Sequence, residues 1–186
     1  MTSYMTKFKH HFQVTLKNLI SKHATAMIMI SFLAIALLSV LPYYTSGYFY
    51  VHIDGTFHIA RIQELVSDYK QETFFPEIAT HTFNSIGDIV PSCYPYFMFY
   101  PVVLLFLLFK PVEALYLGMV LIIFGTLAIA YFSLRLISTT KMTSTYFGLL
   151  YGLNIYVFIE LLYLNHLGEM LAYMFFPLVV SSIYLV

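Results

Sequence analysis

The sequence has few charged residues, a single cysteine and no tryptophan. Of its 186 residues, 10% are charged and 60% are hydrophobic, whereas soluble domains carry about 25% charged and about 45–50% apolar residues. So few charged residues cannot cover the surface of a soluble domain. A disordered chain, in turn, is far less apolar than this sequence. The composition therefore excludes both classes and indicates an integral membrane protein in contact with membrane lipid.

Other absences exclude further classes. The single cysteine, Cys93, leaves no intramolecular disulfide framework and no cysteine-based metal cluster. Nine Lys and Arg balance nine Asp and Glu, so no nucleic-acid partner is expected. The sequence contains no Walker loop, G-x-S-x-G elbow, H-E-x-x-H pair or Rossmann fingerprint. Because tryptophan is missing, the 17 tyrosines must supply most of the aromatic belt at the membrane interfaces.

The apolar runs predict an all-α, polytopic helical membrane protein with about four transmembrane helices. The uncharged segment 24–44 is long enough, at about 1.5 Å per residue, to cross a hydrocarbon core of about 30 Å. The expected spans are residues 24–44, 112–135, 142–159 and 170–186. The last of these ends without a charged or polar flank, which predicts a fragment of a longer protein or an early stop.

The charges predict on which side each loop lies. Residues 1–23 are basic and contain no acid, so the positive-inside rule makes them a cytoplasmic N-terminus. Residues 45–93 are then an extracytoplasmic loop, and their 55–70 segment has the periodicity of an amphipathic juxtamembrane helix. Residues 94–109 are apolar but short, so they form a re-entrant or a short transmembrane segment. The cations after the next span favour the re-entrant form, and residues 160–169 form a later outer loop.

Three ionisable residues at the start of the outer loop form the first candidate site. Asp54, His58 and Arg61 have offsets of four and seven, which place them on one face of a helix. Such a carboxylate acts as a general base or binds a divalent cation, and a guanidinium holds a phosphate in a bidentate fork. A purely structural interpretation is also open: Asp54 is an N-cap, His58 packs at the interface and Arg61 extends to lipid headgroups.

The second candidate site precedes the last span and contains Asn165, His166 and Glu169. Ionisable residues at a membrane boundary are often functional, and Glu169 is expected to face the same cavity as Asp54. The structural alternative is that Glu169 only complements the helix dipole. Glu160 is a less favoured acid of the same loop. If a divalent metal is bound, Asp54 and Glu169 are the candidate ligands.

The aromatic, proline-punctuated run over 91–101 has two interpretations. Proline-broken backbone at membrane depth is tolerated where protein or water covers it, so the run is a candidate wall of a groove that admits lipid. The alternative is a kinked part of the interfacial aromatic belt.

The order of these motifs resembles the N-terminal part of bacterial GT-C-fold membrane glycosyltransferases, in particular the YfhO-like integral membrane proteins. The resemblance covers roughly 40–186. It rests on Asp-Gly-Thr-Phe-His-Ile-Ala-Arg-Ile over 54–62, on the Tyr-Pro pairs within 94–101, on Ala-Tyr-Phe-Ser-Leu-Arg over 130–135, and on Leu-Asn-His-Leu-Gly-Glu over 164–169. The sequence departs from the family in having His-Ile rather than Gly-His before Asp54, and Asn-His where Arg-Gly is common before Glu169.

The resemblance implies a function and a location. It implies transfer of a sugar from a polyprenyl-phosphate donor to an extracytoplasmic acceptor, in the bacterial cell membrane. It also implies Asp54 and Glu169 as catalytic acids, with His58, Arg61 and His166 binding substrate. Members of the class are much longer, so a complete cavity needs further helices. The alternative is a non-catalytic integral membrane protein, either an assembly partner or a truncated gene product. A small transporter is disfavoured because no span carries an interior charge. The sugar and the oligomeric state are left open.

Overall fold

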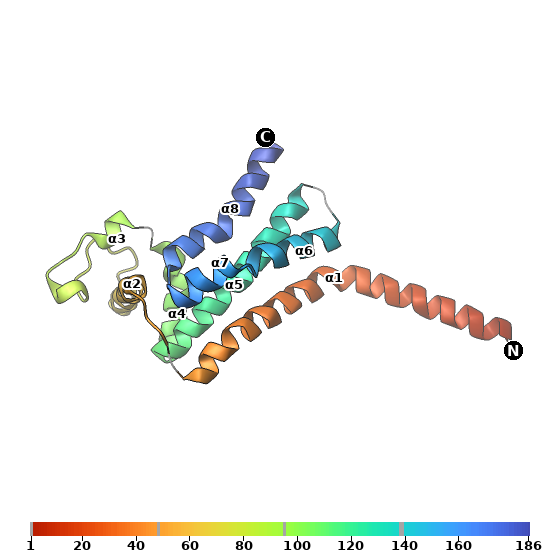
Figure 1. The fold of residues 1–186 in the computed structure, drawn as a ribbon, viewed down its shortest axis with the longest axis horizontal. Coiled ribbons are helices and arrows are strands. Elements are labelled where there is room, and N and C mark those ends of the chain that lie inside the picture. The colour runs from red at the N-terminus through yellow and green to blue at the C-terminus, as the bar shows by residue number, and fades with distance from the viewer. Residues whose placement is uncertain (1, 48, 95, 138–139) are drawn as a thin grey trace.

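The computed structural model describes the backbone of residues 2–47, 49–94, 96–137 and 140–186, and the side chains of these residues apart from 2–22, 53 and 83. Over this part of the chain the fold is all-α, and an isolated bridge between Ala79 and Asp88 is the strand-like pairing found there (Figure 1). The helical elements are α1 Thr2–Ser46, α2 Ile53–Lys70, η1 Phe83–Ser85, α3 Val90–Cys93, η2 Phe97–Phe99, α4 Tyr100–Leu108, α5 Pro111–Leu136, α6 Lys141–Gly152, α7 Ile155–Phe158, η3 Ile159–Tyr163 and α8 Leu167–Leu185.

Three helical stretches are long and apolar enough to cross a membrane, namely His23–Ser46, Pro111–Leu136 and Leu167–Leu185. A fourth candidate is the pair Lys141–Gly152 and Ile155–Tyr163, which is bent by 45° at the break between its helices. The all-α class predicted from the sequence is therefore confirmed over the described residues. Of the four predicted spans, three have a long apolar helix, and the fourth, 142–159, corresponds to the bent pair. The predicted basic N-terminus, 1–23, lies almost wholly outside the described side chains.

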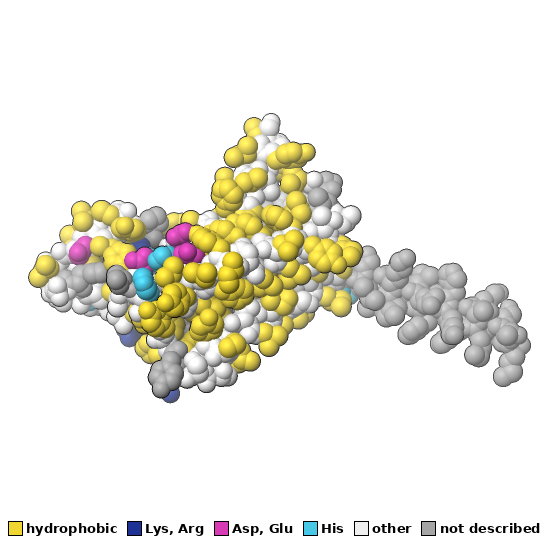
Figure 2. All heavy atoms as spheres, in the orientation of Figure 1, with side chains coloured by type: hydrophobic (Ala, Val, Ile, Leu, Met, Phe, Trp, Pro, Cys, Tyr) yellow, Lys and Arg dark blue, Asp and Glu magenta, His cyan; other side chains and the backbone are white. Residues whose placement is uncertain are grey.

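The outer faces of these helices are apolar, as contact with lipid requires. Large hydrophobic side chains stay exposed along several helices, and Figure 2 shows one face of the molecule on which hydrophobic side chains predominate over the helical bundle. Examples are Ile30, Leu38, Leu150, Phe176 and Ile183. A monomeric soluble protein rarely exposes apolar surface on this scale, so membrane lipid is the natural contact of these faces.

Helix α5 is the centre of the fold, since α1, α4, α6 and α8 all pack against it (Figure 1). Its buried side chains include Ile123, Leu127 and Tyr131, each 0–1% exposed. Phe32 of α1 meets the ring of Tyr131 edge to face, with the centroids 6.2 Å apart. The core that positions the rest of the chain is thus a helix-on-helix contact around α5.

Helix α1 ends and α5 begins at the same end of the bundle, at the lower left of Figure 1. The Tyr116 hydroxyl, near the start of α5, donates a hydrogen bond of 2.9 Å to the carbonyl of Tyr43 in α1. The segment between α1 and α5 therefore starts and finishes at this end of the bundle. Within it, the predicted 94–109 segment contains the short apolar helix Phe97–Leu108, whose α4 part packs on α2 and α5.

Helix α6 approaches α5 closely because Gly148 has no side chain. A Cβ there would lie 2.9 Å from the backbone oxygen of Leu127 and 3.1 Å from the ring of Phe32. We expect Gly148→Ala to lower the free energy of unfolding by about 1–3 kcal/mol, because the helices must separate. The comparison variant is Gly118→Ala in α5, whose Cβ would meet the side chain of Val102 at 3.3 Å rather than a backbone atom, so we expect a smaller loss there. Unfolding in detergent micelles measures both, and equal stabilities of the two variants would contradict this account.

Candidate functional site

Asp54 lies in the first turn of α2, a helix that begins at Ile53 with His52 as its N-cap. The predicted start at residue 55 and the predicted N-cap role of Asp54 are therefore wrong. The helix starts earlier because the carbonyl of His52 already accepts a hydrogen bond from the amide of Thr56. A carboxylate in the first turn is stabilised by the helix dipole. The side chain is 54% exposed, so it is accessible to a ligand.

The chain before α8 has an irregular backbone. Ile159–Tyr163 form a π-helical turn, and Asn165 follows with a φ of 58°, a left-handed conformation that asparagine tolerates better than most residues. The amide of His166 then donates back to the carbonyl of Glu160, and α8 begins at Leu167. Wide turns of this kind are frequent at functional sites, and this one turns His166 toward α2.

Three carboxylates surround the ring of His166. Its Nε2 lies 3.1 Å from Oδ2 of Asp54, and its Nδ1 lies 2.5 Å from Oε2 of Glu160 and 3.7 Å from Oε2 of Glu169. The other oxygen of Glu169 accepts a hydrogen bond from the Tyr156 hydroxyl. Figure 2 shows acidic and histidine side chains gathered in one place on the otherwise hydrophobic face. The structure therefore brings together acids from α2, η3 and α8.

The start of α2 is held against the start of α8 by Asn165, which is 2% exposed. Its Oδ1 accepts the amide of His52 at 3.0 Å, and its Nδ2 donates to the carbonyl of Leu161 at 3.3 Å. Gly55 faces the same side chain so closely that an added Cβ would lie 2.7 Å from Oδ1. These contacts fix the relative position of the two helix starts and hence of the carboxylates that they carry.

His58 and Arg61 lie on the buried side of α2, at 8% and 5% exposure. Nη1 of Arg61 is 3.4 Å from Nδ1 of His58, and the amide of Gly168 donates to His58 Nε2 over 3.4 Å. The guanidinium carbon lies 4.8 to 5.5 Å from three aromatic ring centres, a cation–π arrangement. The rings are those of Phe99, Tyr94 and Phe57. His58 and Arg61, two of the three side chains predicted to bind substrate, are thus positioned by packing.

Burial lowers the pKa of His58 to about 4, and the charge of Arg61 acts in the same direction, while Asp54 opposes it. In the unfolded chain this imidazole has its ordinary pKa near 6.5. The folded state therefore favours neutral His58. The resulting stability is present above pH 6.5 and is lost as the pH falls from 6.5 toward 4.

We expect the free energy of unfolding to fall by about 3 kcal/mol at most across that pH interval, since one pKa unit corresponds to about 1.36 kcal/mol. In His58→Gln this part of the pH dependence should be missing. Unfolding in detergent micelles between pH 4 and pH 7 measures the difference between the two proteins. A difference that stays constant over this interval would contradict the buried, neutral state of His58.

A cavity of about 570 Å³ opens beside Glu169, with His58 and Arg61 in its wall. The remaining wall is mostly apolar and aromatic, including Tyr94, Phe97, Met98, Phe99 and Phe175. Four of these residues belong to the aromatic run over 91–101, so the run lines a cavity, as one of its two interpretations expects. A space of this volume, with a mostly apolar wall that also contains His58, Arg61 and Glu169, suits an amphipathic ligand.

The site also contains the donors that a divalent cation needs. Ligand atoms of Glu160, His166 and Glu169 lie within 4.8 Å of one another, and Asp54 reaches the same imidazole. Carboxylate oxygens with one imidazole nitrogen suit Mn²⁺ or Zn²⁺. Glu160, His166 and Glu169 therefore fit a metal. Of the two acids named from the sequence, Glu169 belongs to this group, whereas Asp54 lies at the opposite nitrogen of the imidazole.

Sequence reasoning placed Asp54, Glu169 and His166 in one region, and the structure brings them together. His58 and Arg61 line the cavity together with Glu169. Asp54 is not among the residues that line it, so of the two acids that were predicted to share a cavity, Glu169 alone lines this one. Sequence reasoning underrated Glu160 and gave no role to Gly55. The available signal for Gly55 was its position directly after a candidate catalytic acid, where a missing side chain permits close approach of another segment.

No family model, no curated protein and no solved structure matched this chain.

Proposed function

We propose that the chain is a membrane glycosyltransferase of the GT-C fold, or the N-terminal part of one. In this proposal it acts in the bacterial cell membrane, with its N-terminus in the cytoplasm, and transfers a sugar from a polyprenyl-phosphate donor to an extracytoplasmic acceptor. One observation carries the proposal: Asp54 and Glu169, far apart in the sequence, both contact His166, and Glu169 also lines the cavity that Arg61 lines.

The chemistry follows from the position of each group. Asp54 takes the proton of the acceptor hydroxyl, whose oxygen then forms the new bond to C1 of the sugar. The bond from C1 to the phosphate oxygen breaks on the opposite face, so the configuration is inverted. Arg61 places a fixed positive charge in the cavity wall, where the leaving lipid phosphate gains negative charge. The aromatic wall accommodates the first part of the lipid.

His166 and Glu160 serve as positioning residues in this scheme. Glu160 is only 14% exposed and contacts Nδ1 of the imidazole, so it fixes the orientation of the ring. The opposite nitrogen then faces Asp54. A divalent cation held by Glu160, His166 and Glu169 would supply additional positive charge for the phosphate, and this donor set fits such an ion.

The test is transfer of a labelled sugar from synthetic polyprenyl-phosphate donors in vesicles from cells that express the complete reading frame. Transfer that depends on this protein supports the proposal. The alternative, a non-catalytic membrane protein, predicts no transfer with any donor and no effect of Asp54→Asn or Glu169→Gln beyond folding. Normal assembly of a partner complex in both variants would support this alternative.

A further inference from the structure

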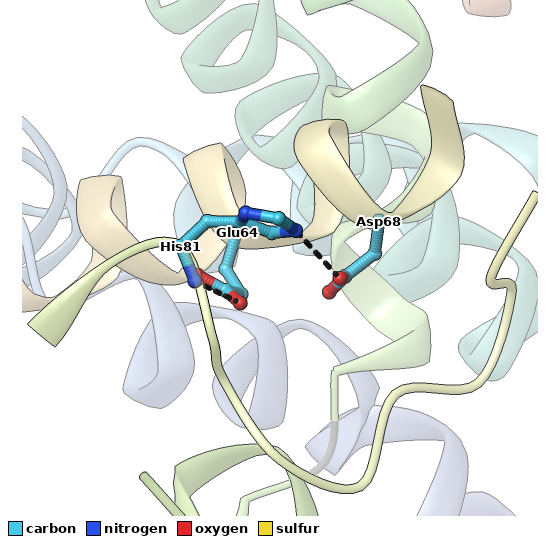
Figure 3. A group of neighbouring side chains, drawn as sticks. All are labelled: Glu64, Asp68 and His81. Carbon is cyan, nitrogen blue, oxygen red and sulfur yellow. Dashed lines mark hydrogen bonds and ion pairs between the residues drawn. The ribbon is translucent and has the colours of Figure 1, made fainter. Parts of the chain in front are cut away.

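A second cluster of ionisable side chains lies at the other end of α2. Glu64 and Asp68 are one helical turn apart on the same face, and His81 reaches them from the loop that follows α2 (Figure 3). Ligand atoms of the three residues lie within 4.8 Å of one another. None of them belongs to the site around His166.

Glu64 is held in its ionised form, although it is only 1% exposed. Its carboxylate accepts hydrogen bonds of 2.5 to 3.1 Å from the amides of Thr80, His81 and Thr82, and from the hydroxyl of Thr82. Burial alone would raise its pKa, but these hydrogen bonds outweigh burial and hold the pKa below its usual range. A full negative charge is therefore fixed inside this cluster.

Asp68 has an incomplete set of partners. It is 6% exposed, and its buried Oδ2 has no hydrogen-bond partner among the described residues. Its Oδ1 lies 3.7 Å from Nε2 of His81, and Figure 3 shows the carboxylate turned toward Glu64 and His81. Burial and the nearby charge of Glu64 both raise the pKa of Asp68, while His81 acts in the opposite direction. A buried carboxylate oxygen without a partner is costly unless a cation or a proton satisfies it.

We propose that Glu64, Asp68 and His81 bind a divalent transition-metal ion, with Zn²⁺ as the best match, and that this ion fastens the outer loop to α2. The ion neutralises two adjacent carboxylates and supplies the missing partner of Asp68. One imidazole with two carboxylates is a donor set that suits Zn²⁺, whereas Ca²⁺ and Mg²⁺ prefer oxygen ligands throughout.

Binding draws together ligand atoms that lie within 4.8 Å of one another, and coordination by Nε2 of His81 replaces its 3.1 Å contact with Nε2 of Gln71. Around Zn²⁺, with bonds of about 2.0–2.2 Å, tetrahedral donors lie about 3.3–3.6 Å apart. The side chain of His81 is 32% exposed and so is able to move closer. Coordination by Oε2 of Glu64 replaces the hydrogen bond from the Thr82 hydroxyl and leaves the three amide donors in place.

The ion would act on the cavity through the loop. After His81, the chain pairs Asp88 with Ala79 in both directions and continues into the aromatic run that lines the cavity. Fixing residue 81 on α2 therefore restrains the segment that carries Tyr94 and Phe97. This role is structural and does not depend on sugar transfer.

The test uses the full chain purified in detergent, with His166→Gln as the background. That substitution removes the imidazole of the other metal-capable cluster, so the titration reports on one set of ligands. Zn²⁺ is titrated against a chromophoric chelator, and bound zinc is counted by mass spectrometry. His81→Gln and Asp68→Asn are compared with two controls, Glu77→Gln from the same loop and His23→Gln from α1.

We expect one zinc per chain in the background protein and in both controls, and an affinity at least about tenfold lower in His81→Gln and Asp68→Asn. Zinc should also raise the unfolding temperature of the background protein and not that of His81→Gln. Because His81 is partly exposed, its replacement does not threaten folding. Equal zinc affinities in the background protein and His81→Gln, or no zinc bound in either, would overturn the proposal.

Discussion

Asp54→Asn should lower the rate of sugar transfer about 10²–10⁴-fold, the range over which a general base contributes. Asparagine keeps the size of the side chain but cannot take the proton of the acceptor hydroxyl. It also removes the negative charge from Nε2 of His166, 3.1 Å away. The measurement is the initial rate of transfer in membrane vesicles at matched protein levels.

Two controls separate chemistry from folding. Asp54 is about half exposed, so its replacement should leave the unfolding temperature in detergent nearly unchanged. Glu77→Gln removes an exposed acid of the same loop and should keep the full rate. Transfer at the wild-type rate in Asp54→Asn would show that another group is the base.

Gly55→Val should disrupt the site and destabilise the fold. The close approach of Gly55 to Asn165 leaves no room for a side chain, because even a Cβ would lie 2.7 Å from Oδ1. Asn165 is buried and hydrogen-bonded on both sides, so it has little freedom to move. We expect a loss of about 1–3 kcal/mol in the free energy of unfolding.

The same change should separate Asp54 from His166, since Asp54 lies in the first turn of α2 and His166 is the N-cap of α8. A distance measurement between spin labels on α2 and α8 detects this separation directly. Asn165→Ala in the Gly55→Val background tests the cause: removing the amide should restore part of the approach and part of the stability. If Gly55→Val keeps both the distance between the labels and the full free energy of unfolding, then this contact does not position the site.

Hydropathy alone predicted the long apolar helices, because a span needs an uninterrupted apolar run and the sequence shows these runs directly. It did not predict the break between α6 and α7, because a single asparagine does not interrupt an apolar run that is averaged over a whole span. There Asn154 acts as N-cap, accepting the amide of Val157 at 3.2 Å. The N-cap preference of asparagine was a signal for a new helix start that hydropathy does not use.

The candidate site was predictable in its residue types and not in its contacts. Asp54 and Glu169 attract attention as acids beside apolar segments. Their meeting at His166 depends on the left-handed backbone of Asn165 and on the space left by Gly55. Both features depend on tertiary contacts and leave no repeating pattern in the sequence from which they could be predicted. The Glu64 cluster was missed for the same reason, because its third member approaches from a loop.

The π-helical turn Ile159–Tyr163 sets the direction in which the side chain of His166 points. An α-helix advances about 100° per residue, so the additional residue in a wide turn rotates everything after it by roughly that angle relative to a regular helix. Deleting one residue from this turn would leave a span of almost the same length and hydropathy. It would, however, rotate the imidazole of His166 away from α2. This chain and the one-residue deletion would therefore insert into a bilayer in the same way, but only in this chain would Asp54 and Glu169 both contact His166.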